Sequence, residues 1–164
     1  MEIQYTLLNA ALGGLDPVFE AYGVEDACVG VAALGPRRSV RRRDAAARRV
    51  DLRALTARDR AVAKEILQRL APWGRGLHPF EACRYSGGGV AVRESSRPAA
   101  FISVHAPRWE TANMAVVDMT VGYGGNVLTL GFSCRVYREG EGWELGTCNC
   151  RGKGRKGDPC VSVW

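Results

Sequence analysis

Strict alternation in the last third of the chain is the pattern that most constrains the fold. In the segment 116–123, every second residue is apolar on one side of a predicted strand: Val117, Met119, Val121 and Tyr123. This two-residue period is typical of a half-buried antiparallel strand. Gly124-Gly125-Asn126 follows, and such residues adopt the positive φ angles of tight hairpins. The sequence therefore predicts a returning strand at Val127–Tyr137 and another that begins at Trp143.

The first 24 residues support two interpretations. Ile3, Tyr5 and Leu7 alternate as in a strand, whereas the later apolar positions repeat as on one face of a helix: Leu8, Ala11, Leu12 and Leu15. We favour a short strand that leads to Gly13-Gly14, because glycine pairs punctuate local structure. Asp16-Pro17 then predicts a helix start, and Gly23 predicts its end.

The middle of the chain predicts one helix and three strands. Thr56–Ala71 is the clearest helix, because Thr56 can cap it and its apolar residues fall on one stripe. Ala27–Leu34 reads as a buried strand, and Val90–Val92 and Ala99–Val104 read as short strands.

Helices followed by a run of strands predict a single α+β domain over residues 1–164. Its helices would pack on one face of a C-terminal antiparallel sheet, which could be strongly curved. The element order resembles the cystatin and ketosteroid-isomerase-like cone folds, in which a curved sheet wraps around a helix. That resemblance implies a fold and no function.

Positive charge is concentrated in two segments rather than spread over the chain. The net charge is +6. The segment Pro36–Arg49 holds seven arginines against one aspartate, and the segment Arg151–Cys160 holds four cations against one aspartate. The rest of the chain is therefore slightly acidic. We expect an exposed basic loop at 36–49 and a cysteine-containing basic tail at 148–164 on an otherwise ordinary domain.

These segments predict a non-enzymatic protein that binds an anionic partner, with nucleic acid first and an acidic protein second. Neither 36–49 nor 151–160 contains the aromatic residues that stack on single-stranded bases. The alternatives are a solvated loop, a localisation signal or a basic arm for an acidic surface. The predicted binding residues are Arg37, Arg38, Arg41, Arg42, Arg43, Arg48, Arg49, Arg151, Lys153, Arg155 and Lys156.

Cys148, Cys150 and Cys160 are spaced like metal ligands, and zinc is the cofactor that three nearby thiolates suggest. The frame Trp143–Cys160 resembles the SWIM-type zinc finger, in which a strand delivers C-x-C and C-x-H closes the site. Ser162 stands where that pattern has histidine, so the fourth ligand would be Cys134, His105, His78 or a partner's residue. The alternatives are free thiols or a disulfide from Cys160 to Cys148 or Cys150.

The other cysteines fall within or beside apolar runs. Cys28, Cys83 and Cys134 are therefore predicted to be free, buried thiols.

A competing hypothesis is a small-ligand-binding protein or an enzyme with a pocket inside a curved sheet. Its residues would be His105, Asp118 and Tyr123. No Ser-His-Asp frame, paired carboxylates or dinucleotide glycine pattern supports catalysis, so we assign no catalytic residue. A third class is a structural accessory protein.

No apolar run approaches the roughly 18 residues of a membrane span. The first residues also lack the basic start and apolar centre of a signal peptide. These features predict a cytoplasmic protein, or a nuclear one in a eukaryotic host or virus.

Overall fold

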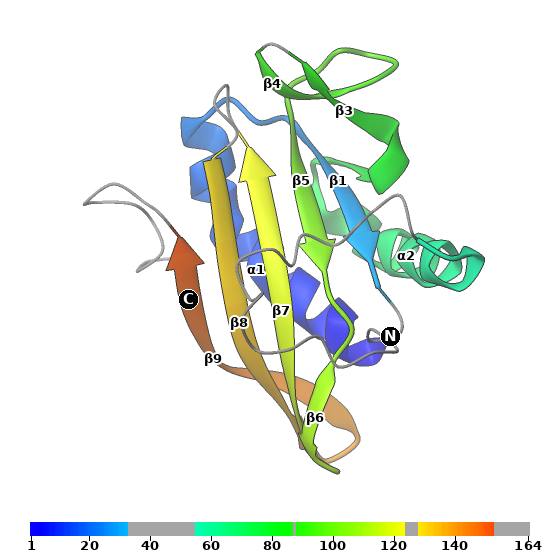
Figure 1. The fold of residues 1–164 in the computed structure, drawn as a ribbon, viewed down its shortest axis with the longest axis vertical. Helices are drawn as coiled ribbons and strands as arrows, with labels where there is room; N and C mark the ends of the chain where they lie inside the picture. Colours follow the sequence, from blue (N-terminus) through cyan, green and yellow to red (C-terminus); the bar gives the residue numbers. More distant parts are fainter. Residues whose placement is uncertain (33–54, 87, 124–127, 153–164) are drawn as a thin grey trace, which may run out of the picture.

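The structure is a computed structural model that describes residues 1–32, 55–86, 88–123 and 128–152. Within these residues the chain forms one α+β domain, in which two α-helices pack against a seven-stranded mixed sheet (Figure 1). In chain order the elements are α1 (Glu2–Ala21), β1 (Asp26–Val31), α2 (Ala57–Leu70), η3 (Ala71–Trp73), β2 (Gly76–Pro79), η4 (Phe80–Ala82), β3 (Cys83–Ser86), β4 (Gly89–Val92), β5 (Ala99–Val104), β6 (Arg108–Thr111), β7 (Met114–Tyr123), β8 (Leu128–Glu139) and β9 (Gly142–Gly152).

The strand order is β2-β1-β5-β7-β8-β9, with β6 paired to the lower part of β7. β1 runs parallel to both β2 and β5, and the remaining pairs of this sheet are antiparallel. The purely antiparallel expectation was therefore wrong at this edge. The reason is that α2 carries the chain back to the starting end of β1, as a helical crossover does between parallel strands.

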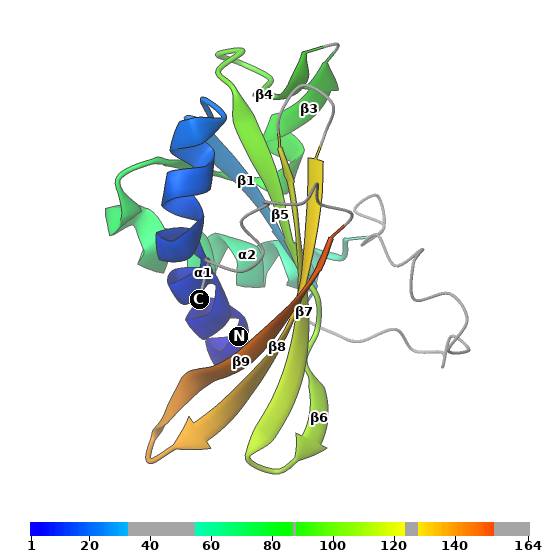
Figure 2. The same cartoon turned by 90° about the vertical axis from the view of Figure 1, so that its left-hand side faces the viewer.

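The sheet is open and not strongly curled, so the cone-like curvature was also a wrong expectation. Both helices lie on the same side of it (Figure 2). On that side the alternating residues of β7 are buried as predicted, together with apolar residues of the neighbouring strands: Val29, Ile102, Val104, Val117, Met119, Val121, Tyr123, Leu130, Phe132 and Val136.

α1 differs from the prediction because one continuous helix replaces the expected strand and short helix. Its buried face repeats at helical spacing: Ile3, Leu7, Leu8, Ala11, Leu12, Leu15, Val18 and Phe19. Pro17 lies inside this helix, where it costs a backbone hydrogen bond. Burial of an entire apolar stripe against the sheet outweighs the weak helix preference of Gly13-Gly14 and Pro17.

α2 begins as predicted. Thr56 accepts a hydrogen bond from the backbone N–H of Asp59 at 3.2 Å, and the Asp59 carboxylate accepts one from the N–H of Thr56 at 2.7 Å. This reciprocal capping box fixes the first turn. The helix ends at Leu70, and the next residues form the 3₁₀ turn η3 around Pro72.

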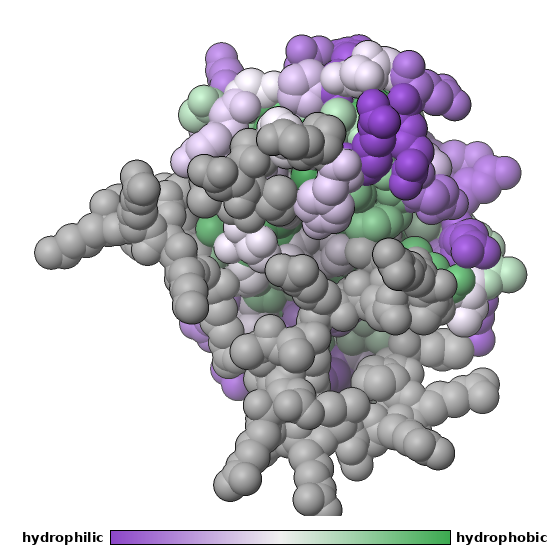
Figure 3. Space-filling view, turned by 45° about the horizontal axis from the view of Figure 1, so that its top comes forward, coloured by the Kyte–Doolittle hydropathy of each residue, from purple (hydrophilic) through white to green (hydrophobic). Residues whose placement is uncertain are grey.

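The opposite side of the sheet is covered only at one end by described residues. There the two-stranded β3–β4 hairpin and η4 pack on β1 and β5. Phe101 of β5 stacks with Phe80 at a centroid distance of 4.3 Å and contacts Tyr85 at 4.8 Å. Seen from the hairpin end, hydrophilic residues gather along one side of the molecule (Figure 3).

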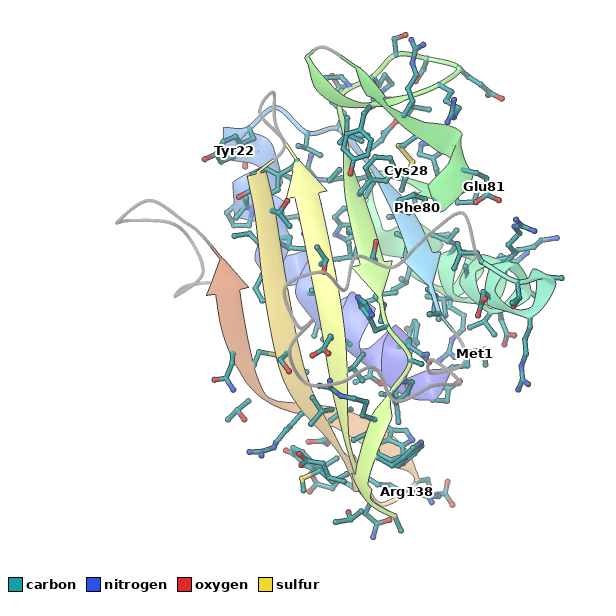
Figure 4. All side chains as sticks on the ribbon, in the orientation of Figure 1. Met1, Tyr22, Cys28, Phe80, Glu81 and Arg138 are labelled. Atoms are coloured by element: carbon teal, nitrogen blue, oxygen red, sulfur yellow. A yellow bond between two sulfur atoms is a disulfide. The ribbon has the colours of Figure 1, made fainter. Side chains whose placement is uncertain are left out.

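A disulfide between Cys28 of β1 and Cys83 of β3 joins the hairpin to the sheet, and it is visible beside Phe80 (Figure 4). A second disulfide joins Cys134 to Cys148, which are direct partners across β8 and β9. The prediction of free thiols at Cys28, Cys83 and Cys134 was therefore wrong. Sequence alone did not show that pairing brings each of them next to another cysteine.

Candidate functional site

Most of the predicted basic binding residues lie outside the described residues. This holds for Arg37, Arg38, Arg41, Arg42, Arg43, Arg48, Arg49, Lys153, Arg155 and Lys156. Arg151 belongs to β9. The described residues hold twelve lysines and arginines against fourteen acidic residues, a net charge of −2. The body of the domain is therefore slightly acidic, and the positive charge belongs to the two segments that adjoin it.

The points where these two segments join the sheet are fixed by strand register. One continuous row crosses the sheet through Val31, Val104, Met119, Phe132 and Cys150. Ala32, the last described residue before the first segment, lies one position beyond this row, and Gly152, the last before the second, lies two positions beyond it. β1 and β9 run in opposite directions, so these ends are displaced by about 10 Å along the strands as well as by four strand spacings of about 4.8 Å across the sheet. The two junctions are therefore about 22 Å apart.

Between these junctions the face away from the helices is lined by small polar side chains. Register places Ser103 beside Thr120, Asp118 beside Ser133, and Ser133 beside Asn149. We call these five residues the polar face. Ser103 is buried, Asn149 is exposed and the others are half-buried. Hydroxyl and amide groups at these positions can donate or accept hydrogen bonds.

Two ion pairs flank the polar face. Arg108 lies 3.1 Å from a carboxylate oxygen of Asp118, and Arg135 lies 3.3 Å from Glu110. The backbone N–H of His105 donates to the carbonyl oxygen of Asp118 at 2.9 Å. The charges of these two ion pairs cancel, so they add no net charge beside the polar face.

The three residues of the small-ligand hypothesis do not converge. Asp118 lies on the polar face and His105 is its neighbour through the backbone. Tyr123 is only 1% exposed and lies on the helix side, where its ring contacts Phe19 at 6.4 Å and Tyr22 at 4.9 Å. The sheet therefore separates Tyr123 from the other two residues.

Two of the three predicted zinc ligands are bonded in disulfides. Cys148 is bonded to Cys134, and Cys150 is also disulfide-bonded. Cys160 lies outside the described residues. Among the described residues, no group of three or more histidine, cysteine or acidic side chains is arranged to hold a metal ion. A disulfide sulfur is no thiolate ligand, so zinc binding stays a prediction that applies to the reduced chain.

A polar cluster that the sequence did not indicate lies around Asp26 of β1. Its buried carboxylate is 3.2 Å from Nε2 of His78 and 3.5 Å from Nη2 of Arg97, which also pairs with Glu25 at 2.8 Å. Gly76 faces Asp26 across the strand pair, and a Cβ at that position would collide with the carboxylate. The cluster therefore joins β1, β2 and the turn before β5. The Gly76-Leu77-His78 segment alone gives no hint of it.

No protein-family model, no curated protein and no solved structure matches this chain. In the part of the chain that the structure describes, neither helix has the length and apolar character needed to cross a membrane.

Proposed function

We propose that this protein is a non-enzymatic binding protein for an extended polyanion. Nucleic acid is the first candidate and an acidic protein the second. The arginines of 36–49 and the cations of 151–156 would neutralise the partner's charge, and the polar face between them would lie against it.

The uneven distribution of charge carries this proposal. A domain body with a net charge of −2 adjoins two strongly basic segments. Surface charge that serves only solubility has no reason to be so concentrated, whereas phosphate binding benefits from clustered cations.

The positions of the two junctions support a single partner that contacts both segments. A separation of about 22 Å corresponds to about six phosphates along one strand of a duplex. Such a partner would pass over the polar face, where hydroxyl and amide groups are available and the flanking ion pairs leave no excess of negative charge.

Binding would be driven by release of counterions from the polyanion. If all eleven predicted cations engaged duplex DNA, log K would fall with log salt with a slope of about −10. A protein that recognises bases through hydrogen bonds and stacking alone would show a much smaller slope.

Fluorescence anisotropy at several salt concentrations tests the proposal. The labelled probes are a 20-nucleotide single strand, the matching duplex and polyglutamate. The variant R41A/R42A/R43A should weaken nucleic-acid binding at least tenfold at low salt and make the salt slope shallower. The matched control R58A/R84A/R138A removes the same charge from exposed positions of the described body. It should change affinity less than twofold.

Equal losses in the two triple variants would show that only net charge matters, and would reject the proposed segments. Tighter binding of polyglutamate than of both nucleic acids would make an acidic protein the first candidate partner. A salt-independent affinity for every probe would exclude charge neutralisation altogether.

The polar face has its own test. Asn149→Glu adds one negative charge at an exposed position of β9, and Ser95→Glu adds one at an exposed turn distant from this row. We expect Asn149→Glu to weaken binding about threefold, and Ser95→Glu to have no measurable effect.

A further inference from the structure

An apolar groove on the outer side of the domain is independent of the basic segments. It lies between α2 and the β1–β2 edge of the sheet, and it has a volume of about 610 Å³. We call it the α2 groove. Eight of its thirteen lining residues are apolar, and Val29, Leu67 and Leu77 also belong to or pack against the main core. A groove of this size and composition is in the range of small-molecule sites.

The polar residues of the α2 groove lie on its rim rather than on its floor. Arg60, Lys64 and Gln68 follow one another at four-residue spacing along α2, so they form one exposed row. Glu81 belongs to η4, and Figure 4 shows it between the β3–β4 hairpin and α2, with Phe80 closer to β1. The rim therefore has two cations on one side and one carboxylate on the other.

The two rim cations are available for a ligand. Within the described residues neither Arg60 nor Lys64 forms an ion pair, whereas Arg69 on the same helix is paired with Glu2. A cation beside an apolar channel attracts an anionic head whose apolar tail lies in the channel. The groove runs along α2 from Arg60 to Ala71, a length of about 16 Å at 1.5 Å per residue.

From this juxtaposition we infer that the α2 groove binds a linear amphiphile with a single anionic head, of the fatty-acid type. The carboxylate lies at Arg60 and Lys64, and the alkyl chain lies over the half-buried Leu67, Leu77 and Phe80. The inference does not depend on the polyanion proposal, because none of the groove residues belongs to either basic segment.

Isothermal titration of the oxidised protein with laurate tests the inference, at concentrations where the probe stays monomeric. Dodecanol has the same chain without charge, and dodecyltrimethylammonium has the opposite charge. We expect saturable binding with one laurate per chain, weaker binding of dodecanol, and no binding of the cation. Absence of saturable laurate binding, or equal binding of all three probes, overturns the inference.

Three variants locate the site. R60Q/K64Q should weaken laurate binding about fivefold and leave dodecanol unchanged, because each exposed ion pair contributes little. R58Q/R84Q is the matched control, since it also removes two positive charges from exposed positions that do not line the groove. Ala71→Trp places a ring in the groove at an exposed position and should weaken laurate and dodecanol at least tenfold.

If Ala71→Trp and a second groove variant, Leu67→Gln, both keep wild-type affinity while circular dichroism shows a folded protein, the site lies elsewhere. Sedimentation with and without laurate tests whether a second copy of the chain occupies the groove. In that case the protein would sediment as a larger species, and laurate would release the second copy. That result would also overturn the inference. Oligonucleotide binding by R60Q/K64Q should be unchanged. A loss of laurate binding in this variant is then distinct from a failure of the polyanion proposal.

Discussion

The two faces of the sheet are formed by the same strands but are stabilised by different means. On one face α1 covers the strands, and a continuous apolar core fills the space between them. On the other face a small cluster around Phe101 is joined to the sheet by the disulfide from Cys28 to Cys83, and the remainder is polar. The first face buries the larger apolar area, and its disulfide, Cys134–Cys148, joins strands that already pair. The second face buries less, and its disulfide joins the separate β3–β4 hairpin to the sheet.

The first prediction compares one phenylalanine from each face. Phe19 of α1 is fully buried against the sheet, and Phe101 of β5 is 6% exposed beneath the hairpin. Phe19→Ala should lower the free energy of unfolding by about 3–5 kcal/mol. Phe101→Ala should cost clearly less, because its smaller cluster can collapse around the change. Urea titration of both variants measures this difference, and equal losses would mean that the two faces contribute alike.

The second prediction concerns the covalent link of the hairpin face. The double variant C28S/C83S should lose about 2–4 kcal/mol, because the disulfide closes a long loop in the unfolded chain. Hydrogen exchange should accelerate first in β3 and β4, while β7 and β8 stay protected. Uniform acceleration throughout the sheet would show that the hairpin is no separate unit.

The third prediction tests the polar cluster at the edge of the second face. Asp26→Asn preserves shape but removes the charge that faces His78 and Arg97. We expect a loss of about 1–3 kcal/mol, as for other buried polar groups that lose a charged partner. Thermal unfolding of Asp118→Asn provides the comparison, since this variant alters the ion pair between half-buried Asp118 and exposed Arg108. The loss for Asp118→Asn should be below about 1 kcal/mol.

The smallest effect is expected from the ion pair that joins the two helices. Hydrogen bonds from the Arg69 guanidinium to the Glu2 carboxylate lower the pKa of Glu2 below its usual value of 4.5. Its stabilisation is therefore fully present above pH 4.5 and is lost as the pH falls through the lower pKa of the folded state. Both groups are exposed, so we expect only a few tenths of a kcal/mol.

Thermal unfolding of the wild type and Glu2→Gln at pH 7 and pH 3 measures this contribution. The difference between the two proteins should be present at pH 7 and smaller at pH 3, since it decreases as the pH falls below 4.5. A large difference would mean that α1 is held by its charge pair more than by its buried face.

Local patterns in the sequence predicted the parts of the fold that local chemistry determines. The alternation around Val117 was sufficient to predict β7, and the capping signal at Thr56 was sufficient to predict the start of α2. Both signals involve residues that are neighbours in the sequence. α1 was interpreted wrongly because its first residues fit both periods, and only the presence of the sheet decides between them. The four-residue strands β2, β3 and β6 are too short to show a period.

The candidate sites depended on pairing between distant segments, which one sequence does not reveal. Cys134 and Cys148 meet because β8 and β9 pair in one particular register, and Cys28 meets Cys83 only after the hairpin folds back. The α2 groove combines residues from five separate elements. The predicted turn at Gly124-Gly125-Asn126 lies outside the described residues and stays a prediction.

Cytoplasmic localisation stays a prediction as well. Stable disulfides are typical of oxidising compartments, so the thiol state of the protein isolated from its source bears directly on it. Labelling of thiols with and without reductant, together with metal analysis, also separates the disulfide state from a zinc-bound reduced state.

The bond between Cys28 and Cys83 closes a ring of the chain that contains α2 and all of residues 33–54. That ring includes the arginines at which trypsin-like proteases cut. A chain nicked anywhere inside the ring would remain one covalent molecule, with its N-terminal fragment still attached to the sheet. Such a nicked protein would migrate as a single species without reductant and as two fragments with it. Limited digestion could therefore alter the basic segment while leaving the domain intact.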